Sequence, residues 1–224
     1  MKNMVKKIFA LALAAAMILS LSACGGDTPA STKQDQPQTT QAPQTAPAQT
    51  DAPQPSESAA PAAAAFEGPI LVISVGKSAD ISIAKSMMAR IKVDYDVFEP
   101  EAGKEPDLTG VKTVIIVPGV STKGLGEAGI QLNDELDATK KIVEKIEAAD
   151  VKVLVAHLGG SSRRDDLTDQ FIDIVLPAAD HIVCLDEGNR DGKFTDYAAQ
   201  HGIPCESAEN ISGLVTNVQK LFGK

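Results

Sequence analysis

The chain has 224 residues, of which 43% are hydrophobic and 23% charged, and it contains no Trp. This composition excludes a collagen, a disulfide-dense miniprotein and a polytopic membrane protein. The formal net charge is −9, from 21 basic and 30 acidic residues. Because nucleic-acid binding depends on clustered Lys and Arg that neutralise phosphates, and no basic block follows the N-terminus, we expect no nucleic-acid partner.

The N-terminus has the pattern of an export signal. Met1–Lys7 carries three Lys, and Ile8–Leu21 is an uncharged apolar run that is too short to span a membrane comfortably. The run ends in Leu21-Ser22-Ala23-Cys24, which resembles a bacterial lipobox. That resemblance implies a lipoprotein signal peptide over residues 1–23 and a lipidated Cys24; an ordinary signal peptide that ends near a Cys is the alternative.

Removal of the signal would take away three Lys and no acidic residue, which leaves a net charge of −12. A chain with this much negative charge is repelled by anionic lipids. We therefore expect the acyl group on Cys24 to hold the protein at the cell membrane, on the extracytoplasmic face. Residues 24–66 are rich in Pro, Gln, Thr and Ala, with Lys33 as the only basic residue. Such a segment buries too little apolar surface to order itself, so we predict a disordered tether.

From residue 67 to residue 224 the pattern changes to alternating strands and helices. Continuous apolar runs rich in β-branched residues predict strands that are covered on both faces. These runs are Ile70–Val75, Thr113–Val117, Val151–Ala156 and Ile182–Leu185. Val93–Phe98 alternates polar and apolar residues, as an edge strand does, and Ile203–Glu206 is a candidate sixth strand.

Stripes of apolar residues with a spacing of 3.6 residues predict helices between the strands. They run from Ile81 to Ile91, from Leu132 to Ile146, from Leu167 to Ile174 and from Ile211 to Leu221. Terminal signals agree with them: Ser162 with Asp165 fits a capping box, Asn133 precedes two acidic residues, and Gly202 suits a C-terminal cap.

The second crossover, Glu99–Lys112, contains two Pro and two Gly and is predicted to be irregular. Alternation of strands and helices over about 158 residues is typical of a single α/β domain with a doubly wound, mostly parallel sheet. We therefore predict a flavodoxin-like or Rossmann-like sheet of five or six strands.

Several of the polar segments together resemble a family of exported bacterial proteins known as a domain of unknown function. The segments are Gly68–Val72, Gly76–Asp80, Ser121–Gly126, His157–Gly160 and Glu187–Gly192. The resemblance covers residues 67–224 and implies the same α/β fold. It implies no activity and no catalytic residues.

Four loops at the carboxyl ends of the predicted strands are dense in Gly, Ser, Lys, Arg and Asn, and ligands of open parallel sheets bind at that edge. Strand-to-helix turns also need Gly and capping hydroxyls, so each loop alone has a structural explanation. Arg163 and Arg164 are predicted in the first turn of a helix, where the macrodipole disfavours cations. A bound anion would compensate them, as would neighbouring acids or solvent. The candidate residues that complete an anion site are Lys77, Ser78, Ser121 and Lys123.

Two motifs in these loops are weaker. Gly124–Gly129 matches G-x-G-x-x-G, but it does not follow the first strand and no acid closes the next one, which argues against a dinucleotide site. Glu187, Asn189 and Asp191 have the spacing of a calcium half-loop, but the closing ligand position is Ala198. We therefore predict a plain acidic turn, with Glu187 and Asn189 as candidate ligand contacts, and neither a metal nor a cofactor.

His157 ends a predicted buried strand at the same edge, where it is either a general base or a histidine that the local backbone satisfies. Cys184 and Cys205 lie on neighbouring predicted strands, either as a disulfide or as buried thiols. The sequence thus favours a lipid-anchored, non-enzymatic binding domain for a small, anionic ligand. The alternatives are a tethered module that binds an extracytoplasmic protein and a hydrolase that uses His157.

Overall fold

The computed structural model describes residues 65–101 and 104–224, which all lie in the compact unit Ala59–Lys224. The predicted signal peptide, Cys24 and almost all of the predicted tether lie outside the described residues. Phe66, at the predicted end of the tether, is 3% exposed, and its backbone N–H donates to the carbonyl of Leu221. The ordered domain therefore includes Phe66.

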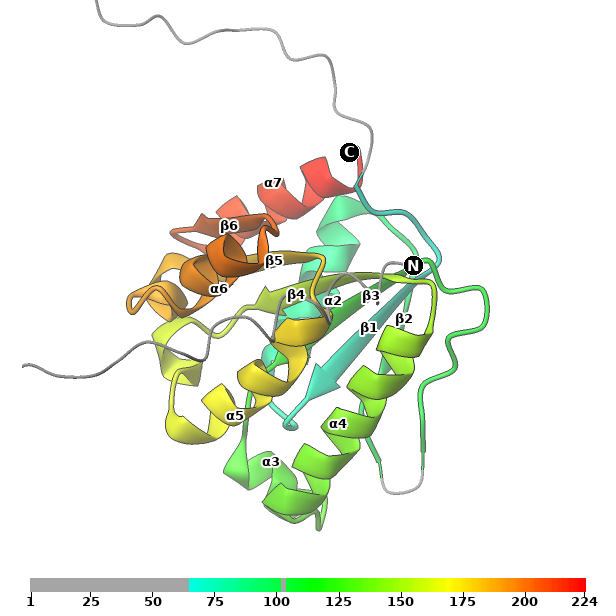
Figure 1. The fold of residues 1–224 in the computed structure, drawn as a ribbon, viewed down its shortest axis with the longest axis vertical. Coiled ribbons are helices and arrows are strands. Elements are labelled where there is room, and N and C mark those ends of the chain that lie inside the picture. The colour runs from blue at the N-terminus through cyan, green and yellow to red at the C-terminus, as the bar shows by residue number, and fades with distance from the viewer. Residues whose placement is uncertain (1–64, 102–103) are drawn as a thin grey trace, which may run out of the picture. The chain divides into compact units, whose positions relative to one another are not determined.

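A six-stranded parallel sheet forms the centre of the domain (Figure 1), and its strand order is β2-β1-β3-β4-β5-β6. This is the flavodoxin-like order with one more strand, and it confirms the predicted fold class. The strands are β1 (Ile70–Val75), β2 (Tyr95–Phe98), β3 (Thr113–Pro118), β4 (Lys152–His157), β5 (His181–Leu185) and β6 (Cys205–Ala208).

Helices cover both faces of the sheet, with α2 and α7 on one face and α4, α5 and α6 on the other (Figure 1). The helices are α2 (Asp80–Ile91), α3 (Thr122–Glu127), α4 (Leu132–Ala148), α5 (Asp166–Val175), α6 (Lys193–His201) and α7 (Ile211–Leu221). Every residue of β1 and β3 is buried, as the continuous apolar runs predict. Among the described residues, no helix has both the length and the apolar character that a membrane span needs.

The predicted elements match the observed ones to within two residues at most boundaries, and β2 is an edge strand as its alternation indicates. Gly202 ends α6 in the left-handed conformation, which confirms the predicted cap. The described part of Glu99–Lys112 contains no helix, as predicted for the irregular crossover. The helix predicted from Leu132 begins at that residue, and Asn133 with the two acidic residues after it lies in the first turn of α4.

The apolar stripes did not identify α3 or α6. The helix α3 is only six residues long and contains two Gly, which have low helix propensity, and α6 buries only Phe194 and Ala198. The carboxyl ends of β1, β3, β4 and β5 nevertheless meet at one edge of the sheet. This edge carries all four loops that the sequence singled out.

Candidate functional site

The loops after β1 and β3 bind each other at the point where the strand order reverses. The backbone N–H of Ser121 donates to the carbonyl of Gly76 over 2.9 Å, and Lys77 forms an antiparallel bridge with Val120. Gly76 has φ +85°, and a Cβ atom there would overlap the carbonyl oxygen of Gly119. Only glycine therefore fits position 76, and the two loops form one rigid rim.

Glu135, in the first turn of α4, stabilises this rim through a buried hydrogen bond. Its side chain is 1% exposed, and its Oε1 accepts a hydrogen bond of 3.0 Å from the backbone N–H of Gly76. Burial raises the pKa of Glu135, against the lowering effects of that hydrogen bond and of the Lys77 charge. Nothing in the sequence distinguishes Glu135, because acidic residues are common in the first turn of a helix, where they complement the helix dipole.

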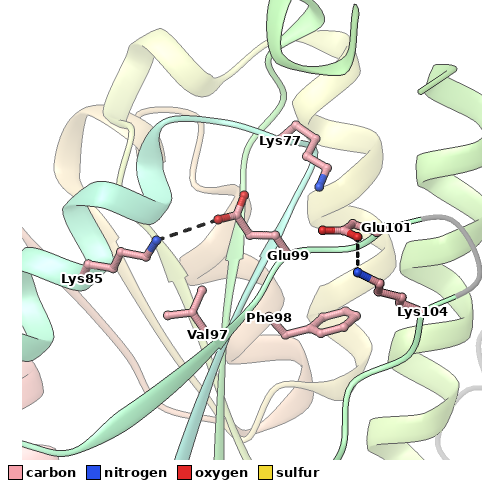
Figure 2. Close-up of a pocket in the computed structure, with 7 residues that line it drawn as sticks. All are labelled: Lys77, Lys85, Val97, Phe98, Glu99, Glu101 and Lys104. Atoms are coloured by element: carbon pink, nitrogen blue, oxygen red, sulfur yellow. Dashed lines mark hydrogen bonds and ion pairs between the residues drawn. The ribbon is translucent and has the colours of Figure 1, made fainter. Parts of the chain in front are cut away.

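Lys77 follows Gly76 and also has a left-handed backbone, with φ +56°. Its side chain extends over a pocket of about 490 Å³ at the carboxyl end of β2 (Figure 2). The side chains that line this pocket with Lys77 are Lys85 on α2, Val97 and Phe98 on β2, and Glu99, Glu101 and Lys104 in the crossover. Three amines, two carboxylates and one aromatic ring therefore surround the same space.

Two ion pairs engage four of the five charges in this pocket, which we call the lysine pocket. Lys85 Nζ lies 3.9 Å from Glu99 Oε1, and Lys104 Nζ lies 2.5 Å from Glu101 Oε2 (Figure 2). The hydrogen bond and charge of Lys104 lower the pKa of Glu101, and the more distant charge of Lys77 contributes less. Lys77 itself forms no hydrogen bond or ion pair through its side chain with the residues that the structure describes.

On the other side of the same loop, Ser78 and Asp80 point away from the lysine pocket and toward β3 and β4. Both are 4% exposed, and Ser78 Oγ accepts a hydrogen bond of 3.2 Å from the backbone N–H of Asp80. Asp80 Oδ1 lies 3.5 Å from Nε of Arg163, which comes from the loop after β4. Ser78 and Arg163 are among the residues predicted from the sequence, whereas Asp80 is not, since nothing in the sequence marks this carboxylate as buried.

The remaining two candidates of the β3 loop have local roles. Ser121 caps α3, because its Oγ accepts a hydrogen bond of 3.0 Å from the backbone N–H of Gly124. The side chain of Lys123 is 84% exposed, and its Nζ lies 3.6 Å from Glu127 Oε1. Neither residue lines the lysine pocket.

The prediction that Arg163 and Arg164 lie in the first turn of a helix is wrong. A short 3-10 turn covers Gly160–Arg163, and α5 begins at Asp166. Asp165, not Ser162, caps α5, since its side chain accepts a hydrogen bond of 2.7 Å from the backbone N–H of Thr168. The helix dipole therefore does not act on the two Arg as it would inside the first turn.

Arg164 binds carboxylates of the chain itself. Its guanidinium donates to Asp169 over 2.9 and 3.2 Å and to Asp191 over 3.1 and 2.6 Å, and also to the carbonyl of Gly188. It also lies 5.4 Å from the centre of the Phe194 ring. The hydrogen bond to Asp169 is the main reason that the pKa of Arg164 is raised. Arg164 therefore links the loop after β4 to α5, to the turn after β5 and to α6, and it has little capacity left for a ligand.

His157 lies under this network. Its ring is 0% exposed, is stacked on Phe194 with 5.1 Å between the ring centres, and has Nε2 3.2 Å from the carbonyl oxygen of Gly160. Burial lowers the pKa of His157. In this position the ring stabilises the loop after β4, and a substrate would reach it only if that loop moved.

The acidic turn after β5 is also occupied by internal contacts. Glu187 Oε2 accepts a hydrogen bond of 3.3 Å from Ser161 Oγ. Asn189 Oδ1 accepts one of 2.9 Å from the backbone N–H of Phe194, at the start of α6, and Asp191 binds Arg164. The described residues contain no group of three or more His, Cys, Asp or Glu side chains arranged to hold a metal ion.

Cys184 and Cys205 lie on adjacent strands but are not direct partners, because Cys205 pairs with Ile182. Both are free thiols. Contact with Cys205 and burial raise the pKa of Cys184, whereas the hydrogen bond from Cys184 lowers the pKa of Cys205. An offset of two residues across neighbouring strands separates the two Cα atoms by about 8 Å, which is too far for a disulfide without movement of the backbone.

A comparison with known families matches residues 67–222 to a family described as Domain of unknown function (DUF6305). The chain belongs to this family. The match covers the whole sheet and every candidate site residue apart from Cys24, and it confirms the resemblance to a domain of unknown function. No protein among those with curated functions matches the chain significantly.

Proposed function

We propose that the chain is a lipid-anchored, extracytoplasmic binding domain that holds a small organic anion in the lysine pocket without transforming it. The anchor on Cys24 and the extracytoplasmic position are inferred from the N-terminal sequence pattern. The anionic character of the ligand is inferred from the pocket. The observation that carries the proposal is the position of Lys77.

The amine of Lys77 extends over the lysine pocket (Figure 2) and, unlike Lys85 and Lys104, forms no ion pair with a described residue. Its backbone has φ +56°, a conformation that costs a non-glycine residue about 1 kcal/mol or more. Two loops and the buried Glu135 hold that conformation in place. Strain that a rigid surrounding maintains is typical of functional positions.

The charges and shape of the pocket support an anion with a flat apolar part. The three amines exceed the two carboxylates by one positive charge, so an anion is attracted more than a cation. Val97 and Phe98 supply apolar surface beside Lys77, and the ring of Phe98 offers a face for stacking. The volume of about 490 Å³ lies within the range of small-molecule pockets.

Binding of simple probes to the unit Ala59–Lys224 tests the proposal. This unit contains all six strands and both hydrophobic clusters, so it can be produced alone. NMR titration with benzoate, and with neutral benzamide as its matched control, measures affinity and location. We expect saturable shifts of the Lys77 and Phe98 amides with benzoate and at least tenfold weaker binding of benzamide. A mass spectrum of the purified unit under native conditions detects a ligand retained from the cell.

Lys77→Gln removes the charge and keeps a polar side chain that is one atom shorter. Loss of a charge-assisted contact of about 1.5–3 kcal/mol should weaken benzoate roughly 10- to 150-fold. Lys123→Gln is the matched control, because the side chain of Lys123 is 84% exposed and outside the pocket. Equal effects of the two substitutions would show general charge attraction and contradict the proposal. Absence of both a retained ligand and any saturable shift would favour a protein-binding module instead.

A further inference from the structure

The edge strand β2 has one free backbone edge. In the described part of the chain, only β1 hydrogen-bonds to the backbone of β2, and β2 ends the sheet (Figure 1). Such an edge carries N–H and C=O groups that can pair with another extended chain. The other edge strand, β6, differs, because the side-chain amide of Asn217 on α7 donates to the carbonyl of Ser207 over 3.3 Å. The edge of β2 is therefore the more open of the two.

A second pocket, of about 330 Å³, lies beside β2. It is lined by residues 69–71 and 96–98 from the sheet and by Asp107, Thr109 and Val111 from the crossover. Two of these side chains are carboxylates, none is cationic, and most of the others are apolar. We call this space the acidic pocket.

The two carboxylates of the acidic pocket have no cationic partner. Asp96 is exposed and forms no hydrogen bond or ion pair with the described residues. Asp107 Oδ1 accepts a hydrogen bond of 2.9 Å from the backbone N–H of Thr109, and no described Lys, Arg or His forms an ion pair with it. In the lysine pocket, by contrast, each carboxylate has a Lys partner. The acidic pocket therefore attracts a cation.

The register of β2 relates the acidic pocket to the free edge. Asp96 pairs with Leu71 on β1, so their side chains lie on the same face of the sheet, and Phe98 lies two residues further along that face. A strand added outside β2 would present the side chain opposite Asp96 on this face as well. The methylene stem of a Lys or Arg at that position would pack on the apolar lining, with its charged end at the carboxylates.

We propose that β2 and the acidic pocket bind an extended peptide segment of a partner protein, which adds a strand to the sheet and places a Lys or Arg side chain beside Asp96 and Asp107. The net charge of −9 also favours a basic segment. A second copy of this chain fits less well, because antiparallel pairing of two β2 strands would bring their Asp96 carboxylates together. The acidic pocket shares Val97 and Phe98 with the lysine pocket, but the inference does not depend on the anion proposed there.

NMR titration of the ¹⁵N-labelled unit Ala59–Lys224 with acetyl-Thr-Val-Lys-Val-Thr-amide tests the proposal. The capped ends leave the Lys side chain as the only charge of this peptide. The same peptide with Gln in place of Lys is the control for charge, and butylamine is the control for the amine without a strand. We expect saturable shifts and slower hydrogen exchange of the β2 amides, unchanged β6 amides, and binding at least fivefold tighter than that of either control.

Asp96→Asn should reduce the preference for the Lys peptide over the Gln peptide to less than twofold. The side chain of Asp96 is exposed, so the variant should fold. Asp94→Asn is the matched control, because Asp94 is also exposed and precedes β2 without lining the acidic pocket.

Four results would overturn the proposal. They are the absence of saturable shifts in β2 with the Lys peptide, equal affinity for the Lys and Gln peptides, butylamine binding as tight as that of the Lys peptide, and equal effects of Asp96→Asn and Asp94→Asn. Dimerisation through β2 without peptide would assign the edge to a second copy instead, and would also contradict it. Benzoate binding is measured separately, so the lysine pocket can fail or succeed without changing these outcomes.

Discussion

Replacement of Arg164 by Met should remove the main electrostatic link between the loops after β4 and β5. The side chain of Arg164 is 11% exposed, and its four contacts with Asp169 and Asp191 measure 2.6–3.2 Å. Loss of one partner from a fully buried ion pair costs about 3–5 kcal/mol. Water recovers part of that cost here, since the side chains of Asp169 and Asp191 are 31% and 58% exposed.

We therefore expect Arg164→Met to lower the free energy of unfolding by about 3 kcal/mol. For a domain of this size that corresponds to a decrease in Tm of roughly 6–12 °C. Urea unfolding followed by far-UV circular dichroism measures the change, and Arg190→Met is the control that removes an exposed Arg. A loss below about 1 kcal/mol, or an equal loss in the control, would refute the structural role of Arg164.

The pH dependence of that difference provides a second check. The hydrogen bond from Arg164 lowers the pKa of Asp191 from 3.8 to about 2. Burial alone raises the pKa of Asp169, but the contacts with Arg164 and Lys193 outweigh it. A carboxylate with a lowered pKa in the folded state adds stability above its unfolded pKa and loses it as the pH falls through the folded value. The difference between wild type and Arg164→Met should therefore shrink between about pH 4 and pH 2.

Three further measurements test the structure. Gly76→Ala should destabilise the domain by more than about 2 kcal/mol in urea unfolding, because its φ is +85° and its Cβ would overlap a carbonyl oxygen; a loss below 1 kcal/mol contradicts the close approach. Burial lowers the pKa values of His157 and His181, so the unfolded chain binds more protons below about pH 6.5 and stability should fall from pH 7 to pH 5; equal or greater stability at pH 5 contradicts it. After incubation with oxidised glutathione, Cys184 and Cys205 should both react with an alkylating agent once the protein is denatured to expose the buried Cys184, and a mass decrease of about two hydrogens would contradict the strand register.

The strands and most helices were predictable because their signals are local. An apolar run such as Thr113–Val117 indicates a strand buried on both faces whatever lies beside it, and the stripe from Leu132 to Ile146 gives the buried face of α4. The alternation in Val93–Phe98 even placed β2 at an edge. Apolar runs and the period of apolar residues are properties of consecutive residues, so both can be read directly from the sequence.

The start of α5 was harder to predict, because Ser162 and Asp165 are both good caps and only the observed contact selects Asp165. The same difficulty applied to the candidate site. The sequence assembled Lys77, Ser78 and Arg163 at one edge, since parallel strands bring their carboxyl ends together. It could not assign their partners.

The sequence by itself determined the α/β class, the order of elements and the edge of the sheet where polar loops gather. Only the tertiary structure decided which charges are satisfied there. Arg164 contacts one carboxylate from α5 and one from the turn after β5, whereas Asp80, which the sequence does not distinguish from an ordinary first-turn acid, is buried with one oxygen unpaired. The reason is physical. The free energy of burying a charged side chain depends on the hydration it loses and on the partners it gains, and both are set by residues distant in the chain.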